Sequence, residues 1–500
     1  MQENTNKAIA INSLIMYAKL FIMTICGLLT TRFALKALGV NDFGLFSVLG
    51  SIITFIAIFN TVMISTSNRF ISVAIGKGDL DFVKEQFNIC RVIHIGIAIL
   101  TVIIAIPLGD YYINHNLQYD GDISKAIDVF HFTVIGSIIS FIGVPYNGLL
   151  IAKEKFVVFS ITEVLTHVFK LAVTFSLLYC FEEKLLIYAF TQGAITAVPT
   201  LVYHIYCKRK YPEILVFEFP RNRNKYKEIF SFSGWVAFGA FATIGKSQGA
   251  QILVNLFFNT VMNTALGLAN TVNGLLGSFA NSIAQPIMPQ ITKNYVAGNK
   301  VRCDELLVMS TKYTFIVTLL ISVPFLSNGD WIMSLWLDDV PPYVMNFTIL
   351  VIIDTLITSL NSGISNMIFA SGKIKLYQVS INTLRLLSIV TAYFVLKSGA
   401  PANSLLLTYI FFSIIIFFVG QVVIRKTLHY DNRFLWKRSY IPSLIISLLV
   451  LPVLVLNFWS NPLINIMFSE LFLLVLIFVF FLGDIEKRVI SKIIFKNVKI

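Results

Sequence analysis

Long apolar runs of about twenty residues follow one another along the whole chain, separated by short polar segments. A helix needs about twenty apolar residues to cross the hydrocarbon core of a bilayer. The pattern therefore predicts an all-α membrane protein with about fourteen transmembrane helices. These spans are predicted at 8–31, 43–72, 88–109, 126–151, 157–180, 185–207, 230–258, 262–289, 307–327, 343–370, 374–396, 403–424, 440–458 and 463–482.

The pattern also repeats at an interval of about 220 residues. The stretch around Gly44, LGVNDFGLFSVLGSI, matches the stretch around Gly267, NTALGLANTVNGLLG. The interval covers six predicted helices, an even number, so both copies keep one orientation in the membrane. Such parallel repeats are related by an axis along the membrane normal, and we expect a central cavity between them. The predicted organisation is a six-helix lobe at 1–207, a basic linker at 208–229, a second six-helix lobe at 230–425, and two extra helices with a basic tail at 426–500.

Basic residues in the polar segments predict the orientation, because Lys and Arg collect in cytoplasmic loops. With the N-terminus inside, the cytoplasmic loops receive most of the basic residues, including the whole of the linker. The outer loops then carry acids such as Asp120, Asp122 and Glu182. Both termini are therefore predicted to be cytoplasmic.

Composition agrees with a membrane protein and excludes several functions. The chain is 56% hydrophobic and 13% charged, whereas soluble domains are about 25% charged. The basic residues behind its net charge of +13 lie mostly in the loops, so we expect no nucleic-acid partner. The five cysteines are scattered without a C-x-x-C pair, so we expect neither a disulfide framework nor a metal site. The sequence lacks a Walker A motif, G-x-S-x-G, H-E-x-x-H and a dinucleotide-binding turn, and we expect no cofactor and no enzymatic activity.

Four basic residues, however, fall near the midpoints of predicted spans: Lys19, Lys170, Lys246 and Arg385. A cation at the bilayer centre costs about 2.5–3.5 kcal/mol unless it faces water, a counter-charge or a ligand. The repeat relates the helix of Lys19 to that of Lys246, and the helix of Lys170 to that of Arg385. The pattern favours a cationic cavity for an anionic substrate. The alternative is a local ion pair or a side chain that reaches the membrane surface.

Two intramembrane acids accompany these cations. Glu163, His167 and Lys170 are spaced i, i+4 and i+7, which places them on one helix face. They are interpreted either as a polar cavity wall that exchanges protons or as a local neutralisation of Lys170 by Glu163. Asp354 is interpreted as a partner of Arg385 or as a ligand of a coupling cation. Glu163 and Asp354 are therefore the ion-coupling candidates.

Other polar residues carry two interpretations each. Amide stripes within spans suit sugar hydroxyls, but they also join helices in lipid; with His167, the polar cavity candidates are Gln248, Gln251, Asn255, Asn270, Asn273, Asn281 and Asn361. Three basic residues near the predicted cytoplasmic boundary form a candidate portal for a phosphorylated lipid, or else reach to headgroups: Arg69, Arg91 and Lys312.

The stretch TRFALKALGVNDFGLFSVLGSI fits the pattern R-x-x-x-x-x-L-G-x-x-x-[FY]-G around Arg32, Gly39 and Gly44. In this pattern and in its whole length the chain resembles bacterial polysaccharide flippases, which translocate O-antigen or capsule repeat units and belong to the multidrug/oligosaccharidyl-lipid/polysaccharide exporter superfamily. The resemblance implies two rocking lobes and alternating access through the cationic cavity, powered by an ion gradient. It also implies a groove for the lipid tail at the C-terminal hairpin.

The implied substrate is an undecaprenyl-pyrophosphate-linked oligosaccharide, flipped from the inner to the outer leaflet of the bacterial inner (cytoplasmic) membrane. Membrane lipids, a polysaccharide polymerase and a chain-length regulator are the implied partners. A flippase for a peptidoglycan lipid precursor remains an alternative. A cation-coupled drug exporter is another, although its cavity would be acidic. An enzyme such as a membrane glycan polymerase or acyltransferase would need a large outer loop or a catalytic His/Asp motif.

Overall fold

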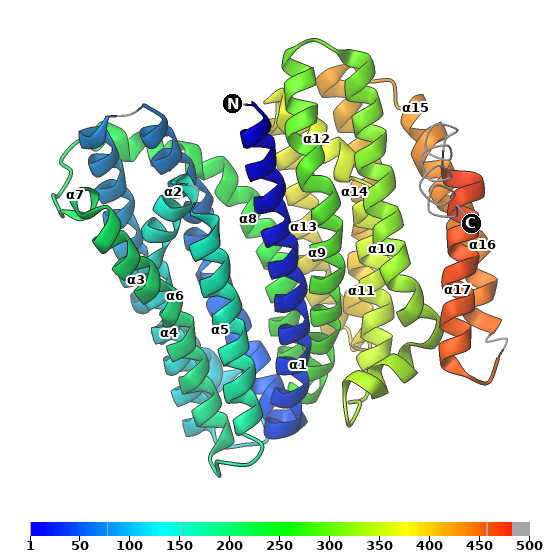
Figure 1. The fold of residues 1–500 in the computed structure, drawn as a ribbon. Helices are drawn as coiled ribbons and strands as arrows, with labels where there is room; N and C mark the ends of the chain where they lie inside the picture. Colours follow the sequence, from blue (N-terminus) through cyan, green and yellow to red (C-terminus); the bar gives the residue numbers. More distant parts are fainter. Residues whose placement is uncertain (1, 78, 154, 457–458, 483–500) are drawn as a thin grey trace, which may run out of the picture. The chain divides into compact units, whose positions relative to one another are not determined.

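The computed structural model describes residues 2–77, 79–153, 155–456 and 459–482 (Figure 1). Regular structure in these ranges is helical throughout. The chain divides into two compact units, Met1–Gly267 and Leu268–Ile500. The division falls inside one helix, α9 (Thr260–Val296). The predicted boundary at the linker 208–229 stays a prediction.

The first unit is a bundle in which α4 packs against α2, α3 and α6, while α1 packs against α5 and α8. Phe87, Tyr146 and Tyr203 belong to one of its buried clusters, which joins α3, α4 and α6. The helices of this unit are α1 (Gln2–Ile56), α2 (Ile58–Lys77), α3 (Leu80–His115), α4 (Ile123–Ala152), α5 (Phe156–Ser176), α6 (Lys184–Lys210), α7 (Pro212–Leu215) and α8 (Arg223–Phe257).

Two glycines of the L-G-x-x-x-F-G pattern shape the first helix. Gly39 has φ +78° and ψ 173° and breaks α1 into two segments. Residues with a side chain rarely adopt this backbone conformation, so glycine is suited to the break. Gly44 lies against the start of α9, where an added Cβ would come within 1.9 Å of the Thr260 carbonyl oxygen. The motif therefore turns the chain and permits a close helix contact.

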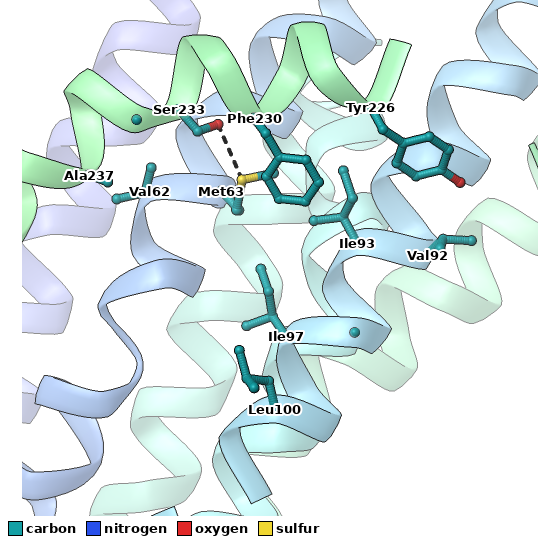
Figure 2. Close-up of a pocket in the computed structure, with 12 residues that line it drawn as sticks. Val62, Met63, Val92, Ile93, Ile97, Leu100, Tyr226, Phe230, Ser233 and Ala237 are labelled. Carbon is teal, nitrogen blue, oxygen red and sulfur yellow. Dashed lines mark hydrogen bonds between the residues drawn. The ribbon is translucent and has the colours of Figure 1, made fainter. Parts of the chain in front are cut away.

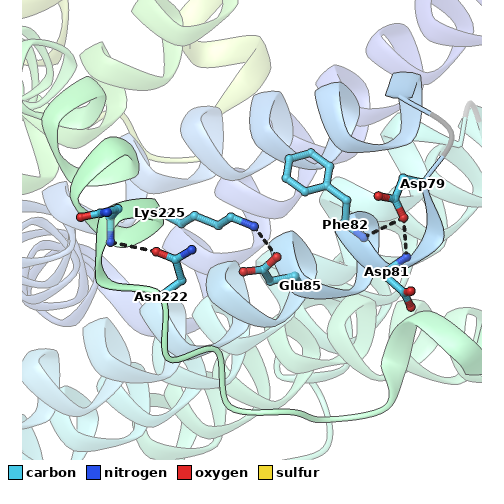
Figure 3. A network of polar contacts seen from close by, with 7 residues as sticks. Asp79, Asp81, Phe82, Glu85, Asn222 and Lys225 are labelled. Carbon is cyan, nitrogen blue, oxygen red and sulfur yellow. Dashed lines mark hydrogen bonds and ion pairs between the residues drawn. The ribbon is translucent and has the colours of Figure 1, made fainter.

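Polar side chains fix where several helices begin. The Asp79 carboxylate accepts hydrogen bonds from the backbone N–H groups of Asp81 and Phe82 at the start of α3 (Figure 3). Asn222 accepts from the backbone of Asn224 at the start of α8. Such caps satisfy amide groups that the first helical turn leaves unpaired. Lys225 forms an ion pair with Glu85, which joins the first turn of α8 to α3.

In the second unit, α10 packs against α11, α12, α16 and α17, and α13 packs against α14. Phe315 and Val323 of α10 share a buried cluster with Ile446 and Leu473, so the C-terminal helix pair lies on α10. The helices are α10 (Lys300–Trp336), α11 (Val344–Ser359), α12 (Ser362–Ser371), α13 (Lys375–Lys397), α14 (Asn403–Leu428), α15 (Arg433–Leu435), α16 (Ile441–Leu456) and α17 (Pro462–Leu476), with π-helical turns at Trp436–Tyr440 and Ile477–Phe481.

The described residues contain ten helices that are long and apolar enough to cross a membrane, or eleven if the bent pair α11–α12 is one span. The all-α membrane fold is thus confirmed, whereas the predicted number of fourteen spans is not. The predicted span 343–370 is two helices bent by 42°. The region Phe21–Phe55 counts as one span although Gly39 interrupts it. Helices α8 and α9 carry many amide and hydroxyl groups, which lower their hydropathy.

Candidate functional site

Four polar residues of α5, which are Glu163, Thr166, His167 and Lys170, line a pocket of about 250 Å³ within the first unit. Glu163, His167 and Lys170 face it, as the i, i+4, i+7 spacing predicts. The opposite walls come from α4 and α6. Their lining residues include Ser140, Asn147, Thr196, Thr200 and Tyr203. The pocket therefore combines one carboxylate, one ammonium group, one imidazole and several hydroxyl and amide groups.

Glycines set the geometry of the α4–α6 wall. A Cβ on Gly136 would lie 2.5 Å from Cα of Gly193, so the two helices approach closely at this point. A Cβ on Gly143 would lie 2.1 Å from the Thr200 hydroxyl oxygen. Small residues permit such close packing of membrane helices. The close packing positions the hydroxyl-bearing face of α6 opposite α5.

The charges of the pocket are unequal. Glu163 accepts a hydrogen bond from the Tyr203 hydroxyl at 3.1 Å, and Lys170 donates to the Thr196 hydroxyl at 3.4 Å. The ammonium group of Lys19, on α1, lies 3.9 Å from the ring centroid of Phe159. Glu163 attracts both Lys19 and Lys170 electrostatically. Counted formally, these three side chains are two cations and one carboxylate.

The pocket also presents neutral hydrogen-bonding groups. His167 donates through Nδ1 to the backbone carbonyl of Glu163 at 3.0 Å, so Nε2 is the remaining polar atom of the ring. The side-chain oxygen of Asn147 is buried and has no hydrogen-bond partner among the described residues. Together these groups suit a ligand that carries both a negative charge and hydroxyl groups.

The other two predicted cavity cations lie outside this pocket. Lys246 is partly buried on α8 of the first unit. Arg385 is on α13 of the second unit and donates to the Asn382 side-chain oxygen at 3.1 Å. Lys170 lines the pocket with Glu163, whereas Lys19 on α1 is not one of its lining residues and interacts with Glu163 electrostatically. A shared site that also contains Lys246 and Arg385 stays a prediction.

Two side-chain amides of α8, those of Gln251 and Asn255, form hydrogen bonds to neighbouring segments. Gln251 accepts hydrogen bonds from the Asn263 side chain through both its backbone and its side-chain oxygen, at 2.7 and 2.8 Å. Asn255 accepts from the Tyr112 hydroxyl and the Gln118 backbone N–H, and donates to the Gln118 carbonyl. These contacts favour the helix-packing interpretation for both residues. Gln248 is partly buried, and its side-chain amide donates to the Ser247 hydroxyl at 3.4 Å.

The second unit holds the remaining candidates. Asp354 accepts a hydrogen bond from Ser413 of α14, and Asn273 accepts from Thr355 at 2.8 Å. Asn361 is buried at the break between α11 and α12, and neither polar atom of its side chain has a partner among the described residues. Asn270 is partly buried and Asn281 is exposed.

The three portal candidates have different surroundings. The Arg91 guanidinium lies 5.1 Å from the ring centroid of the exposed Phe217. Lys312 is 7% exposed, and its ammonium group lies 5.2 Å from the ring centroid of Phe481. It is therefore enclosed by aromatic rings, where an ammonium group is attracted to the ring face, and not at an open surface. The side chain of Arg69 lies outside the described residues.

The sequence analysis missed Asn147, Thr196 and Tyr203, which complete the pocket. Each is a polar residue within a predicted span, and this was the available signal. Which of them face α5 depends on the packing of α4 and α6. Among the described residues, no group of three or more His, Cys, Asp or Glu side chains is placed to hold a metal ion.

No family model matches the chain, and no curated protein matches it. Solved structures do. A multidrug-resistance MATE family transporter of the MOP superfamily, in its inward-facing conformation, matches with a TM-score of 0.68 and 14% identity over 82% of this chain and 96% of that chain. Lipid II flippase MurJ, in an inward closed conformation, matches with a TM-score of 0.67 and 16% identity over 97% and 99%. A MATE protein in complex with MaD3S matches with a TM-score of 0.60 and 14% identity over 85% and 97%.

These identities show the fold, which is common to transporters and to a flippase. The chain is therefore a multi-pass membrane protein with the fold of the MATE transporters and of lipid II flippase MurJ.

Proposed function

We propose that the chain flips an undecaprenyl-pyrophosphate-linked oligosaccharide repeat unit from the inner to the outer leaflet of the bacterial inner membrane. The observation that carries the proposal is the pocket that Lys170 lines together with Glu163, with Lys19 as a second cation that Glu163 attracts. A cation at membrane depth is costly without a counter-charge. An anionic headgroup supplies the missing counter-charge, so the site is complementary to a pyrophosphate.

Neutral groups of the pocket support a sugar-bearing ligand. Asn147, Thr196 and Nε2 of His167 lie at the same pocket as Lys170. Sugar hydroxyls both donate and accept hydrogen bonds and so fit amide, hydroxyl and imidazole groups. A carrier for hydrophobic cations would need an excess of acids, whereas this cluster has an excess of positive charge.

The extent of the structural matches favours a lipid flippase over a drug exporter. The match to lipid II flippase MurJ leaves 3% of this chain uncovered, while the match to the inward-facing MATE transporter leaves 18%. A flippase for a peptidoglycan lipid precursor is therefore the second candidate. Restoration of growth in cells depleted of their own lipid II flippase would support it, whereas restoration of surface glycan alone supports the first proposal.

The direct test is the surface glycan of cells in which this chain is the sole flippase of its pathway. Lys170→Ala removes the charge that faces the pocket, and we expect surface glycan to fall about tenfold or more, because about 1.4 kcal/mol corresponds to a factor of ten. Lys170→Arg keeps the charge and is expected to retain part of the activity. Normal glycan in both Lys19→Ala and Lys170→Ala would overturn the proposal.

Lys125→Ala is the matched control. Lys125 belongs to the same unit, its side chain is 38% exposed, and it pairs with Glu183 at 2.8 Å between helix ends. Surface ion pairs contribute little, so this variant should show normal glycan. All variants should be compared at equal membrane levels.

Coupling to an ion gradient is the further part of the proposal. Glu163 is at the pocket itself, and Asp354 bonds to Ser413 in the second unit. Glu163→Gln or Asp354→Asn should abolish the response of glycan export to a collapsed proton or sodium gradient. A polymerase and a chain-length regulator would act on the exported unit.

A further inference from the structure

A second cavity, of about 530 Å³, lies in the first unit among α2, α3 and α8, away from the polar pocket (Figure 2). Its walls are almost wholly apolar. On α3 they run from Val92 to Leu100, and on α8 from Tyr226 to Ala237. At 1.5 Å per residue these stretches are about 12 and 16 Å long. The cavity, which we call the α3–α8 slot, is therefore elongated along the helices.

The slot is closed on one side by packed apolar side chains and is open to the surface on another. Met63, Ile89, Ile93 and Ile229 form a buried cluster beneath it. Phe230 and Leu100, which also line it, are 55% and 47% exposed. The Ser233 hydroxyl is engaged within the protein, with the Ile229 carbonyl, Thr66 and the Met63 sulfur (Figure 2). The slot thus offers an apolar channel that opens sideways.

Two glycines border the slot and place no side chain in it. Gly96 on α3 and Gly234 on α8 both line it, and a Cβ added to either would meet no atom within 4 Å. Glycines in membrane helices commonly permit close helix packing, as Gly136 and Gly193 do in this unit. Gly96 and Gly234 instead border open space. Their absence of side chains maintains a cavity.

One end of the slot is polar and basic. Lys225, beside Tyr226, pairs with Glu85, which precedes Val92 by two turns of α3 (Figure 3). The segment 221–228 holds four cations and one acid. Three of these cations, Arg221, Arg223 and Lys227, are exposed and have no ion-pair partner among the described residues. The Tyr226 hydroxyl is buried without a hydrogen-bond partner within the same described part of the chain.

We propose that the α3–α8 slot binds the polyprenyl chain of an anionic polyprenyl-phosphate lipid, with the phosphate at the basic start of α8. The inference rests on the proposed function, which supplies the lipid class, and assigns it a site distinct from the pocket of Lys170. With a volume of about 530 Å³ and walls about 16 Å long on α8, the slot is large enough for part of one hydrocarbon chain. The apolar walls match the hydrocarbon chain of such a lipid, and the basic segment 221–228 matches its phosphate.

The test is native mass spectrometry of the purified full-length protein titrated with undecaprenyl phosphate. Gly96→Leu and Gly234→Leu fill the slot, and we expect each to weaken retention of this probe about tenfold, because the chain loses its buried apolar contact. Gly96→Ala should have a smaller effect. Undecaprenol, which lacks the charge, should bind about tenfold more weakly than undecaprenyl phosphate to the unaltered protein.

Gly50→Leu is the matched control, because Gly50 is also helical and bordered by open space but lies on α1, outside the slot. It should bind the probe normally, and all variants should elute as monodisperse protein. Unchanged retention in Gly96→Leu and Gly234→Leu would overturn the proposal. So would equal competition by diacyl phosphatidylglycerol, which would identify a general lipid site.

The two proposals fail separately. Lys170→Ala leaves the slot intact and should retain undecaprenyl phosphate as the unaltered protein does. Normal surface glycan in the Lys19 and Lys170 variants, together with weaker retention in Gly96→Leu, would overturn the function and keep the slot. Loss of glycan in Lys170→Ala with unchanged retention in Gly96→Leu would overturn the lipid site in the slot and keep the proposed function.

Discussion

Glu163 is the residue on which the charge of the polar pocket depends, because it attracts Lys19 and Lys170 and accepts from Tyr203. Glu163→Gln keeps an oxygen acceptor for Tyr203 but leaves both ammonium groups without a counter-charge. We expect thermal unfolding to shift to lower temperature, by an amount corresponding to about 1–3 kcal/mol. The exposed Glu183, which pairs with Lys125, gives the control Glu183→Gln, for which we expect no measurable shift.

His94 has a structural role that can be tested in the same way. It is fully buried on α3, and its ring nitrogens contact Ser67 at 3.0 Å and Asn60 at 2.9 Å on α2. His94→Ala removes the ring and leaves two polar groups unpaired, so we expect a loss of about 2–4 kcal/mol in unfolding free energy. His115→Ala, at the exposed end of the same helix, should lose less than about 0.5 kcal/mol. Equal losses in both variants would contradict this role.

For single residues, the sequence predicted which side chains share one face of one helix. The spacing of Glu163, His167 and Lys170 was sufficient to place them on one face. It contained no information on Asn147 or Tyr203, because these reach the pocket from α4 and α6. Lys312 was predicted close to the membrane boundary, but the rings of Tyr313 and Phe481 enclose it. The surroundings of such a side chain depend on contacts between helices that are far apart in sequence.

At the scale of elements, the close contact of α1 with the start of α9 depends on Gly44. Gly44→Ala would place a methyl group within 1.9 Å of the Thr260 carbonyl oxygen, so the helices must separate. We expect a lower unfolding temperature and reduced membrane levels, with a cost of about 1–3 kcal/mol for overpacking. Gly50→Ala, on the same helix segment but facing open space, should leave both unchanged. A normal unfolding temperature in Gly44→Ala would show that this contact is dispensable.

The elements themselves were predicted more fully than the site. Apolar runs determine helices in a bilayer because each backbone hydrogen bond must be made within the segment. Breaks inside a run are harder to predict. The bend between α11 and α12 leaves the apolar pattern continuous. The break at Gly39, by contrast, falls between the predicted spans 8–31 and 43–72, although α1 is helical on both sides of it. The number of fourteen spans stays a prediction, since ten or eleven helices among the described residues are long and apolar enough to cross a membrane.

At the scale of the whole molecule, the predicted orientation can be tested with the cysteines already present. Cys180 is exposed between α5 and α6, whereas Cys26, Cys90, Cys207 and Cys303 are buried. The Lys/Arg bias places this connection outside. A membrane-impermeant maleimide should therefore label intact spheroplasts, and Cys180→Ser should abolish the signal. Labelling of Cys180 only in inverted vesicles would reverse the orientation.

The presence of two lysines, Lys19 and Lys170, for the one carboxylate of Glu163 has a thermodynamic consequence. If the proposed anionic headgroup binds beside these cations, it lowers the free energy of the native state. A ligand that binds only the native state at 100 times its Kd adds about 2.7 kcal/mol of stability. Heat resistance measured against a panel of candidate cargoes would then rank them without any transport assay, and the protein would serve as its own sensor.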